Sequence, residues 1–139
     1  MFHCGLMNVH VAVLCDAATD TLGKLNLLGA FDAIFTQQLP LVHPMCSVAL
    51  RATFDSREEG ARHLRLNFVD ADGRPFMPAI ELPFQVALPE DAHFVTQNFI
   101  FTMQLLRFEK PGLYSIDISL DDRQVASIPL LIKYSPPKT

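Results

Sequence analysis

Apolar and polar residues alternate along most of this chain, as expected of strands that have one buried and one solvated face. The alternation is clearest over residues 113–120, where Tyr114, Ile116, Ile118 and Leu120 are apolar and most residues between them are polar. Successive side chains of a strand point to opposite faces, so apolar residues at every second position predict a half-buried strand. No segment clearly shows the spacing of about 3.6 residues that predicts an amphipathic helix. We therefore expect an all-β fold.

The same alternation predicts strands over most of the chain, separated by turns rich in Gly, Pro, Asp and Ser. The expected strands are residues 8–16, 24–31, 45–54, 62–69, 75–88, 94–108, 113–120 and 123–134. Residues 32–44 carry two prolines and are expected to form an extended crossover. Prolines within 75–88 and 123–134 favour edge strands there, because proline cannot donate a ladder hydrogen bond. Residues 94–108 would span about 50 Å if straight, so we expect a bend or bulge within them.

Seven or eight short strands without intervening helices indicate a two-sheet antiparallel β-sandwich of the immunoglobulin-like kind. A chain of 139 residues is long enough for one domain, and its eleven Phe supply large groups for the core. We expect a single domain over residues 8–134, a disordered lead over residues 1–7 and a loose tail over residues 135–139. Either Met1 or Met7 can then be the start of the chain.

Charge and hydropathy argue against two classes of partner. The formal net charge is -4 at pH 7 with basic and acidic residues interspersed, so no basic stripe is present to bind nucleic acid. No segment approaches the roughly twenty apolar residues of a membrane-spanning helix. The apolar run 9–15 lacks the basic region and the cleavage site of a signal peptide. We expect a cytoplasmic protein that binds neither nucleic acid nor a membrane.

Cysteine usage agrees with a reducing compartment. The three cysteines, Cys4, Cys15 and Cys46, cannot all pair within one chain, and a secreted disulfide scaffold has a denser, even set. Cys15 and Cys46 fall on apolar faces of expected strands, where an unpaired cysteine behaves as a small apolar residue. We expect both to be buried and reduced.

The segment Pro111-Gly112-Leu113-Tyr114, which leads into an alternating strand and a hairpin, resembles the tyrosine corner of immunoglobulin-like domains. In that corner a tyrosine at the start of the penultimate strand is tied to backbone, so the resemblance implies a structural role for Tyr114. The likeness covers the architecture alone, because Ile116 stands where the second cysteine of an antibody domain would be and the chain contains no Trp.

Three segments carry a more specific resemblance that extends over most of the chain. They are Cys15-Asp-Ala-Ala, Gly23-Lys-Leu-Asn-Leu-Leu-Gly-Ala-Phe-Asp32, and Leu39-Pro with His43-Pro44. On these segments the chain resembles a family of uncharacterised bacterial proteins of unknown function with a small immunoglobulin-like sandwich. The resemblance implies a bacterial, cytoplasmic, single-domain protein and carries no activity, ligand or site with it. Turns or bulges are the expected roles of Gly23 and Gly29.

Metal-ligand residue types occur in two short motifs, and neither is completed. His43-x-x-Cys46 lacks the second close pair that a structural zinc site needs, and Cys46 is expected to face the core. Asp70-x-Asp72-Gly73 begins like a calcium loop, but the residues that follow lack the further oxygen ligands, so a hairpin turn is the better interpretation. We expect no metal and no cofactor.

No catalytic constellation is visible in the sequence. It contains neither a nucleophile elbow of the Gly-x-Ser-x-Gly type nor a glycine-rich phosphate loop. The carboxylates that could form an acid–base pair lie in expected turns, and they are Glu58, Glu59, Asp70, Asp72, Asp121 and Asp122. We expect a protein that is not an enzyme.

One sheet face is the remaining feature that points to a function. If residues 8–16, 45–54 and 94–108 share a sheet, its outer face is mildly apolar, which can mark an interface. The inner face of the first strand is expected to hold Val9, Val11, Val13 and Cys15. The candidate interface residues on the outer face are Leu14, Ala49, Ile100, Thr102 and Leu106. The alternative is that the crossover 32–44 or the N-terminal residues cover this face.

We therefore expect a non-catalytic β-sandwich that associates with an unknown protein partner or with itself as a homo-oligomer. The alternative is a sandwich that binds a small ligand, a sugar or a metal, through the turns 70–73 and 121–122 or the region of His43. An enzyme is the third hypothesis, and it would need a cleft with convergent, pKa-shifted groups.

Overall fold

The computed structural model describes residues 7–138, and most of them lie in strands. The nine strands of this part of the chain are β1 (Asn8–Thr21), β2 (Lys24–Phe31), β3 (Ala33–Thr36), β4 (Leu41–Phe54), β5 (Gly60–Val69), β6 (Ile80–Val86), β7 (Val95–Phe108), β8 (Gly112–Leu120) and β9 (Arg123–Tyr134). A single 3-10 turn, η1 (Ser56–Glu58), follows β4. No helix in the described chain is long and apolar enough to cross a membrane. The all-β prediction is confirmed, with nine strands in place of seven or eight, because the predicted crossover contains β3 and the start of β4.

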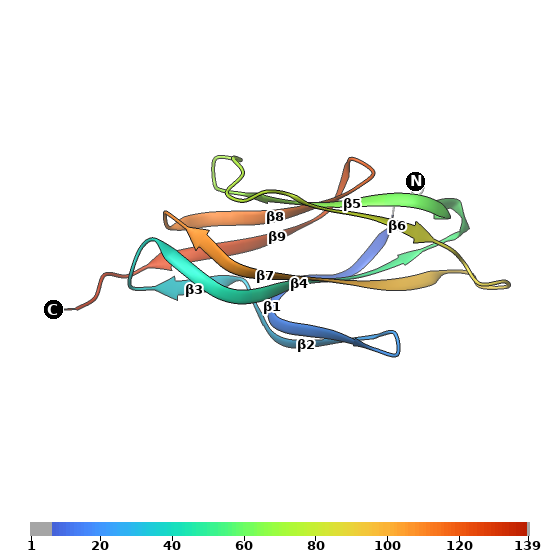
Figure 1. Cartoon of the computed structure of the whole chain (residues 1–139), viewed down its shortest axis with the longest axis horizontal. Coiled ribbons are helices and arrows are strands. Elements are labelled where there is room, and N and C mark those ends of the chain that lie inside the picture. Colours follow the sequence, from blue (N-terminus) through green and yellow to red (C-terminus); the bar gives the residue numbers. More distant parts are fainter. Residues whose placement is uncertain (1–6, 139) are drawn as a thin grey trace.

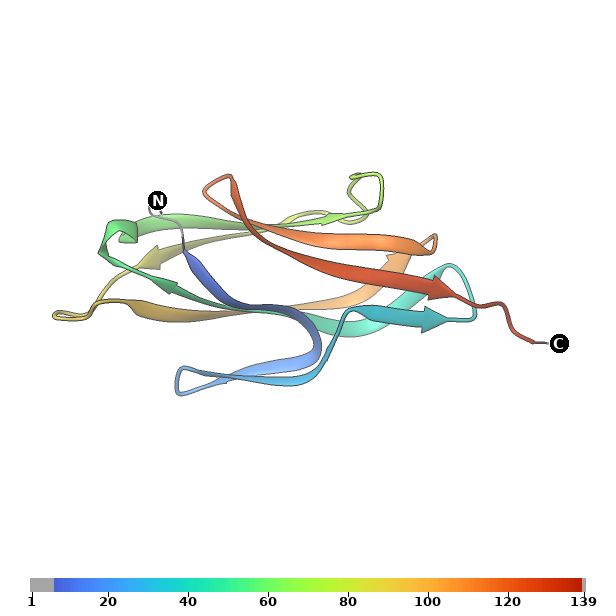
Figure 2. The same ribbon diagram turned by 180° about the vertical axis from the view of Figure 1, so that it is seen from behind.

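The strands form two sheets that pack face to face as a sandwich (Figure 1; Figure 2). The four-stranded sheet has the order β2-β1-β4-β7, and the five-stranded sheet has the order β3-β9-β8-β5-β6. Neighbouring strands are antiparallel except β3 and β9, which are parallel. The predicted two-sheet antiparallel sandwich is confirmed, with this one parallel pair as the exception. A parallel pair needs a long connection, and here the chain passes through β4 to β8 between its two members.

The order of the strands is that of an immunoglobulin-like domain. β1, β4 and β7 occupy the places of strands A, B and E, and β9, β8, β5 and β6 those of G, F, C and C′. Tyr114, near the start of β8, donates a hydrogen bond from its hydroxyl to the carbonyl of Lys110 at 2.6 Å. This contact is the tyrosine corner of the fold, so the structural role predicted for Tyr114 is confirmed. Burial raises the pKa of Tyr114, which keeps its hydroxyl protonated and able to donate.

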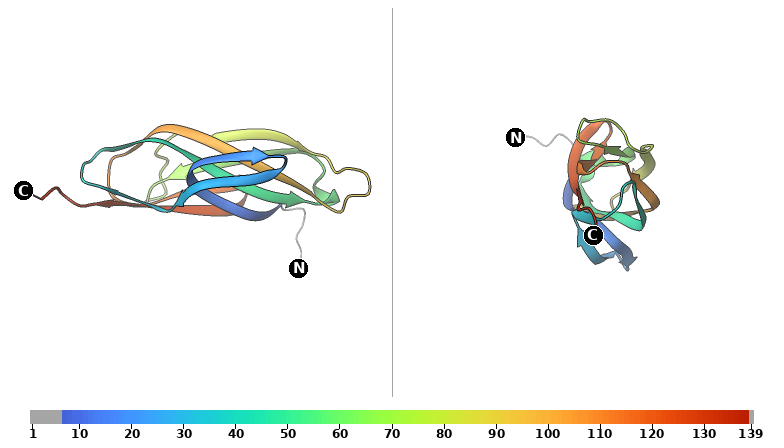
Figure 3. Two further views of the ribbon diagram at one scale, coloured as in Figure 1. Left: turned by 90° about the horizontal axis from the view of Figure 1, so that it is seen from below. Right: turned by 90° about the vertical axis from the view of Figure 1, so that its left-hand side faces the viewer.

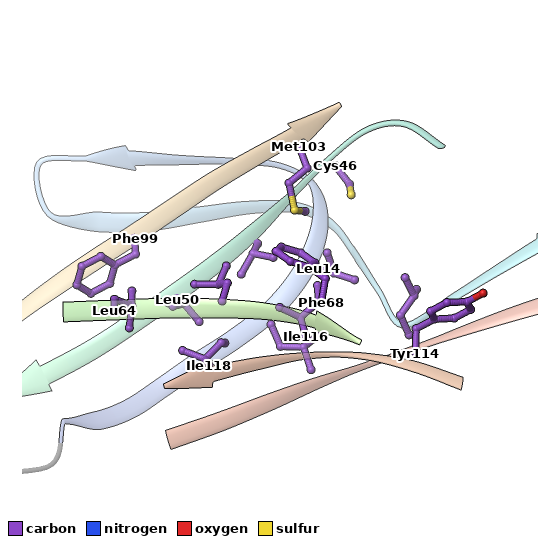
Figure 4. Packing of buried hydrophobic residues seen from close by; sticks show 14 of the residues in the cluster. Leu14, Cys46, Leu50, Leu64, Phe68, Phe99, Met103, Tyr114, Ile116 and Ile118 are labelled. Carbon is purple, nitrogen blue, oxygen red and sulfur yellow. The ribbon is translucent and has the colours of Figure 1, made fainter. Parts of the chain in front are cut away.

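The core lies between the two sheets and is filled by every second side chain of the central strands (Figure 4). β4, β5 and β8 follow the predicted alternation without change. Their buried apolar side chains are Cys46, Val48, Leu50, Ala52 and Phe54 from β4, Leu64, Leu66 and Phe68 from β5, and Tyr114, Ile116, Ile118 and Leu120 from β8. Phe76 and Phe108 pack against Tyr114 with ring centroids 5.0 Å from the tyrosine ring, so an aromatic cluster closes one end of the core.

A β-bulge between Val9 and Val11 exchanges the two faces of β1. Val9 pairs with Ala52, and Val11 pairs with the adjacent Arg51, so β1 accommodates one extra residue. Because side chains alternate, one extra residue turns every later side chain to the opposite face. Leu14 is therefore fully buried in the core. The prediction that Leu14 faces outward is wrong for this reason.

A second irregularity lies where Pro44 of β4 faces Leu105 of β7. Pro44 has no N–H to donate, and Leu105 has a φ of +56° with its side chain 69% exposed. The ladder is continuous on both sides of this position, but the alternation in β7 is reversed beyond it. A bend or bulge is the prediction for residues 94–108; β7 keeps one register with β4 throughout and so contains no bulge, and its irregular position is the left-handed Leu105. Leu106, predicted to face outward, is instead buried in the core.

The ends of the domain differ slightly from the expected boundaries. Met7 was expected in the disordered lead, but it is buried and belongs to the core cluster. The rest of that predicted lead, residues 1–6, lies outside the described residues. In the tail, the amide of Ser135 donates to the carbonyl of Thr36 at 2.9 Å. Residues 136–138 are exposed and have no regular secondary structure, and Thr139 lies outside the described residues.

Replacing Tyr114 with Phe should destabilise the fold, because it leaves the Lys110 carbonyl without its donor. We expect Tyr114→Phe to lower the free energy of unfolding by about 1–3 kcal/mol in urea, with an unchanged m-value. Tyr134→Phe is the matched control: Tyr134 is 40% exposed, so a change below about 0.5 kcal/mol is expected. Equal losses in the two variants would contradict a tyrosine corner that stabilises the sandwich.

Candidate functional site

The second half of β1 and β2 form a hairpin that folds back against the outer face of the four-stranded sheet (Figure 3). At its tip the carbonyl of Gly23 accepts hydrogen bonds from Nη1 of Arg51 at 2.9 Å and from Nδ2 of Asn98 at 3.1 Å. Nδ2 of Asn98 also lies 2.9 Å from Oδ2 of Asp20. Arg51 lies on β4 and Asn98 on β7, so the tip is tied to both strands. The hairpin therefore adds a third layer over part of the sandwich.

The hairpin packs on small side chains of the outer face. Cys15 and Ala49 are fully buried and Ser47 is 3% exposed, although all three point away from the core. The hydroxyls of Ser47 and Thr102 lie 3.0 Å apart, and Sγ of Cys15 donates to the carbonyl of Ser47 at 3.6 Å. The face is thus covered, and the hairpin provides the cover in place of the crossover 32–44. The N-terminal residues 1–6, which are the other predicted cover of this face, lie outside the described part of the chain.

Two glycines shape the hairpin. Gly29 has a φ of +67°, and a Cβ at this position would clash with the carboxylate of Asp16. Gly23, in the turn, has a φ of +82°, and its N–H donates to Oδ1 of Asp20 at 2.9 Å. The turn predicted at Gly23 is confirmed, whereas Gly29 lies within β2 and its register with β1 is unbroken, so the prediction of a turn or bulge at Gly29 is wrong. The hydrogen bond from Asn98, and next that from Gly23, hold the pKa of the Asp20 carboxyl below its usual value.

Three of the five predicted interface residues are not accessible to a partner. Leu14 and Leu106 face the core, and Ala49 lies under the hairpin. The other two, Ile100 and Thr102, lie on the outer face of β7, where Ile100 is half-buried and Thr102 is exposed. A broad apolar sheet face is therefore ruled out as the interface. The two predicted interface residues that remain accessible, Ile100 and Thr102, both lie on β7.

β7 has the properties of an edge that can pair with another strand. It stands at the end of its sheet, and no described strand pairs with its outer side. Its 14 residues include no proline, and Arg107 is the one charged residue among them. An edge of this kind presents a row of N–H and C=O groups to an incoming strand. In the sequence, this edge is marked by the uncharged run 95–106. The alternation of apolar and polar residues describes only the two faces of the strand, so it does not reveal the edge.

The other three edges within residues 7–138 are blunted. β6 contains Pro83, and the carbonyl of Gln85 on the same strand accepts a hydrogen bond from the side chain of Gln97 at 3.2 Å. β3 is four residues long, and β2 is bent away with the hairpin and begins with Lys24. Proline, charge and short length are the usual protections of an edge. In an immunoglobulin-like sheet a D strand pairs with strand E, but no described segment takes that place beside β7.

A pocket of about 470 Å³ lies at the end of the sandwich that holds the tyrosine corner. Its wall combines the aromatic rings of Phe76 and Tyr114 with the turn 70–73. Oδ1 of Asp70 accepts hydrogen bonds from the amides of Asp72 at 2.9 Å and Arg74 at 3.0 Å. These bonds close a tight turn, which confirms the hairpin-turn interpretation of Asp70-x-Asp72-Gly73.

The turn 121–122 lies at the opposite end of the sandwich. Oδ1 of Asp121 accepts from the amide of His63 at 2.9 Å, and Oδ2 accepts from Nη1 of Arg62 at 3.0 Å. Asp121 thus ties the β8–β9 turn to β5. Because β5 and β8 pair along an antiparallel ladder, this turn and the turn 70–73 are separated by the length of that ladder. A single ligand site built from both turns is therefore wrong.

His43 and Cys46 do not converge on a common point. The ring of His43 packs against that of Phe31 with centroids 5.8 Å apart, and its Nε2 is buried without a hydrogen-bond partner. Cys46 lies in the core, where burial raises the pKa of its thiol to about 11. Burial also raises the pKa of the Cys15 thiol, and both cysteines are buried and unpaired, as predicted. Within residues 7–138, no three His, Cys, Asp or Glu side chains come together as metal ligands do.

The sequence model of one protein family, the family of unknown function DUF6941, matches residues 10–133. The chain therefore belongs to this family. The match confirms the resemblance to a family without an established activity. No curated protein sequence matches the chain.

Two solved structures resemble the fold at low identity. One is the alkylpurine DNA glycosylase AlkC of Pseudomonas fluorescens bound to DNA containing an abasic site analog, with a TM-score of 0.47, 8% identity and 91% of this chain covered. This chain spans only 30% of the length of that glycosylase chain. The other is an immunoglobulin-like protein from Pseudomonas aeruginosa, with a TM-score of 0.41, 10% identity and coverage of 94% of this chain and 98% of that chain. Neither likeness bears on function.

Replacing Asn98 with Ala should loosen the hairpin and expose Cys15 more often. In a Cys4→Ser background we expect several-fold faster maleimide labelling of Cys15, followed by mass spectrometry. Cys46 is the internal reference, because it faces the core and its labelling does not depend on the hairpin. Asn67→Ala, on the outer face of the other sheet, is the matched control and should leave both rates unchanged. A Cys15 rate that is the same in Asn98→Ala as in the parent would show that these bonds do not hold the hairpin down.

Proposed function

We propose that this member of the family acts without catalysis, as an association module that pairs the outer edge of β7 with β7 of a second copy. The observation that carries the proposal is the contrast among the sheet edges. β2, β3 and β6 each have a feature that discourages pairing, whereas β7 is long, free of proline and uncharged over residues 95–106. A protein that only needed to stay monomeric would gain from a charge or a proline on its longest edge.

A second copy fits this edge because an antiparallel strand pair can be symmetric. Two copies of β7 related by a two-fold axis each offer the same row of donors and acceptors to the other. The pairing would extend the four-stranded sheets of the two copies into one continuous sheet. The side chains of Ile100 and Thr102 would then lie beside the junction, on the side that the hairpin leaves partly open.

The magnitudes favour a dimer of moderate affinity. An overlap of residues 95–106 allows roughly ten backbone hydrogen bonds, each with a net contribution of about 1 kcal/mol. Association costs about 4–15 kcal/mol in lost translational and rotational freedom. At the lower end of that cost the balance leaves about 6 kcal/mol, so we expect a dissociation constant of roughly tens of micromolar and a dimer population that depends on concentration.

Sedimentation velocity over a range from about 1 μM to about 100 μM tests this proposal. The parent protein should shift from the 15.5 kDa monomer toward a dimer as its concentration rises. Thr102→Lys should hold it monomeric at all concentrations, because both copies then bring a charge to the shared edge. Gln37→Lys adds the same charge in the exposed loop between β3 and β4, outside the paired residues 95–106, and should leave the dimer unchanged.

Three results would contradict the proposal. One is a parent protein that stays monomeric over the whole range. Another is a dimer that Thr102→Lys and Gln37→Lys weaken equally, because the effect would then come from net charge alone. A dimer that neither variant weakens would place the interface away from β7 and would equally overturn it.

A second candidate function is the binding of a small sugar in the pocket beside the tyrosine corner. The specific observation is the combination of aromatic rings, which can stack on a sugar, with the carboxylates of Asp70 and Asp72 at its rim. A saturable rise in melting temperature with a neutral monosaccharide, retained in Thr102→Lys, would support it. No rise with any sugar of a monosaccharide panel would remove it.

The proposed cellular location is the cytoplasm. Cys15 and Cys46 are both unpaired and buried, which suits a reducing compartment.

A further inference from the structure

A pocket of about 490 Å³ lies at the end of the sandwich opposite the tyrosine corner, where β1 begins and β4 ends. Its wall includes polar side chains from three strands, the η1 residues Arg57 and Glu58, and Asp55 at the start of η1. The remaining polar members are Asn8, Thr53 and Gln124, and the apolar members are Met7, Phe54, Phe94 and Val125. A volume of this size falls in the range of small-molecule sites.

Glu58, in η1, is one of the residues that line this pocket, and its carboxylate is deeply buried. The residue is 2% exposed. Its Oε1 accepts the amide of Asp55 at 2.9 Å, within a capping box that turns the side chain inward and fixes its position. Its Oε2 is buried and has no hydrogen-bond partner. A buried carboxylate oxygen without a donor costs the folded state free energy, so the site favours a ligand that can donate to it.

The cations nearest to Glu58 along the chain are engaged elsewhere. The guanidinium of Arg57 forms a bidentate ion pair with the carboxylate of Asp55, with Nη2 2.6 Å from Oδ2. Arg62 donates from Nε to the backbone carbonyl of Glu58 at 2.8 Å and from Nη1 to Asp121 at 3.0 Å. Neither arginine forms an ion pair with the Glu58 carboxylate. Although Arg57 also lines the pocket, both arginines are thus paired with other carboxylates, those of Asp55 and Asp121.

We propose that this pocket binds a small organic cation, an ammonium or guanidinium group on a short aliphatic stem, with Oε2 of Glu58 as its acceptor. The side-chain oxygens of Asn8, Thr53 and Gln124 offer further acceptors to the remaining N–H groups. Phe94, 60% exposed at the pocket wall, offers a ring face to the cation and an apolar surface to the stem. The inference does not depend on the pairing of β7, because none of these residues belongs to that strand.

The same chemistry can come from a free amine or guanidine, or from a Lys or Arg side chain of another protein. The two sources are distinguished by the size of the probe. Butylguanidinium represents the free ligand, and a blocked Gly-Arg-Gly peptide represents the side chain, with Gly-Ala-Gly as its blank.

Isothermal titration of the full chain with butylguanidinium and butylammonium chlorides tests the proposal, at an ionic strength held constant with sodium chloride. We expect saturable binding of the cations and none of butanol. Glu58→Gln should weaken binding at least about ten-fold, because the amide keeps the acceptor for the Asp55 N–H and removes the charge. Glu59→Gln is the matched control: Glu59 is the exposed neighbour, its change in net charge is the same, and its effect should stay within about two-fold.

Three results would overturn the proposal: no saturable binding of either cation, equal binding of butanol, or equal loss in Glu58→Gln and Glu59→Gln. Far-UV circular dichroism and urea unfolding of Glu58→Gln show whether the variant is folded. If Glu58→Gln is not folded, the preference of the parent protein for the cations over butanol still tests the proposal. Binding of the arginine peptide as well as butylguanidinium assigns a partner's side chain, and binding of butylguanidinium alone assigns a free ligand.

Discussion

A strand presents its side chains alternately to two faces, so one extra or irregular residue exchanges those faces for everything beyond it. The four-stranded sheet depends on two such positions. The bulge between Val9 and Val11 turns Leu14 into the core, and the break at Pro44 and Leu105 does the same for Leu106. These exchanges allow β4, β7 and the first half of β1 to contribute to one core. The bulge in β1 also leaves the small side chain of Cys15 on the outer face near Ala49 of β4, where the hairpin of β1 and β2 can lie close.

The hairpin changes what the molecule offers to its surroundings. In the described chain the outer face of the four-stranded sheet is partly occupied by the protein itself, through the bonds from Arg51 and Asn98 to the hairpin tip. No described strand takes the D position, so the protection of this sheet stops at its face and does not extend to the edge of β7. The resulting surface is better suited to backbone pairing than to the packing of two apolar faces, and the proposed dimer follows from this difference.

The sequence was most informative where one residue type determines one contact. Tyr114, after Pro111-Gly112, predicted the tyrosine corner, and the alternation of β4, β5 and β8 predicted their buried residues correctly. The bulge in β1 carries no glycine or proline to mark it, so the faces of that strand could not be assigned without the pairing of β4. The parallel pairing of β3 and the folding back of the hairpin depend on contacts between residues far apart in the sequence. The burial of Glu58 is not predicted for a different reason: Asp55-Ser-Arg-Glu58 has the capping-box spacing, but charged residues in a turn are usually solvated.

The central claim is that the edge of β7 is where this protein associates. Backbone hydrogen exchange of residues 95–106, followed as the protein concentration is raised, tests it most directly, because pairing protects the amides that point away from β4. The account predicts protection in β7 that grows with concentration, while the amides of β6 exchange at a constant rate. Protection of β7 that is independent of concentration, or a rise confined to another strand, would contradict it.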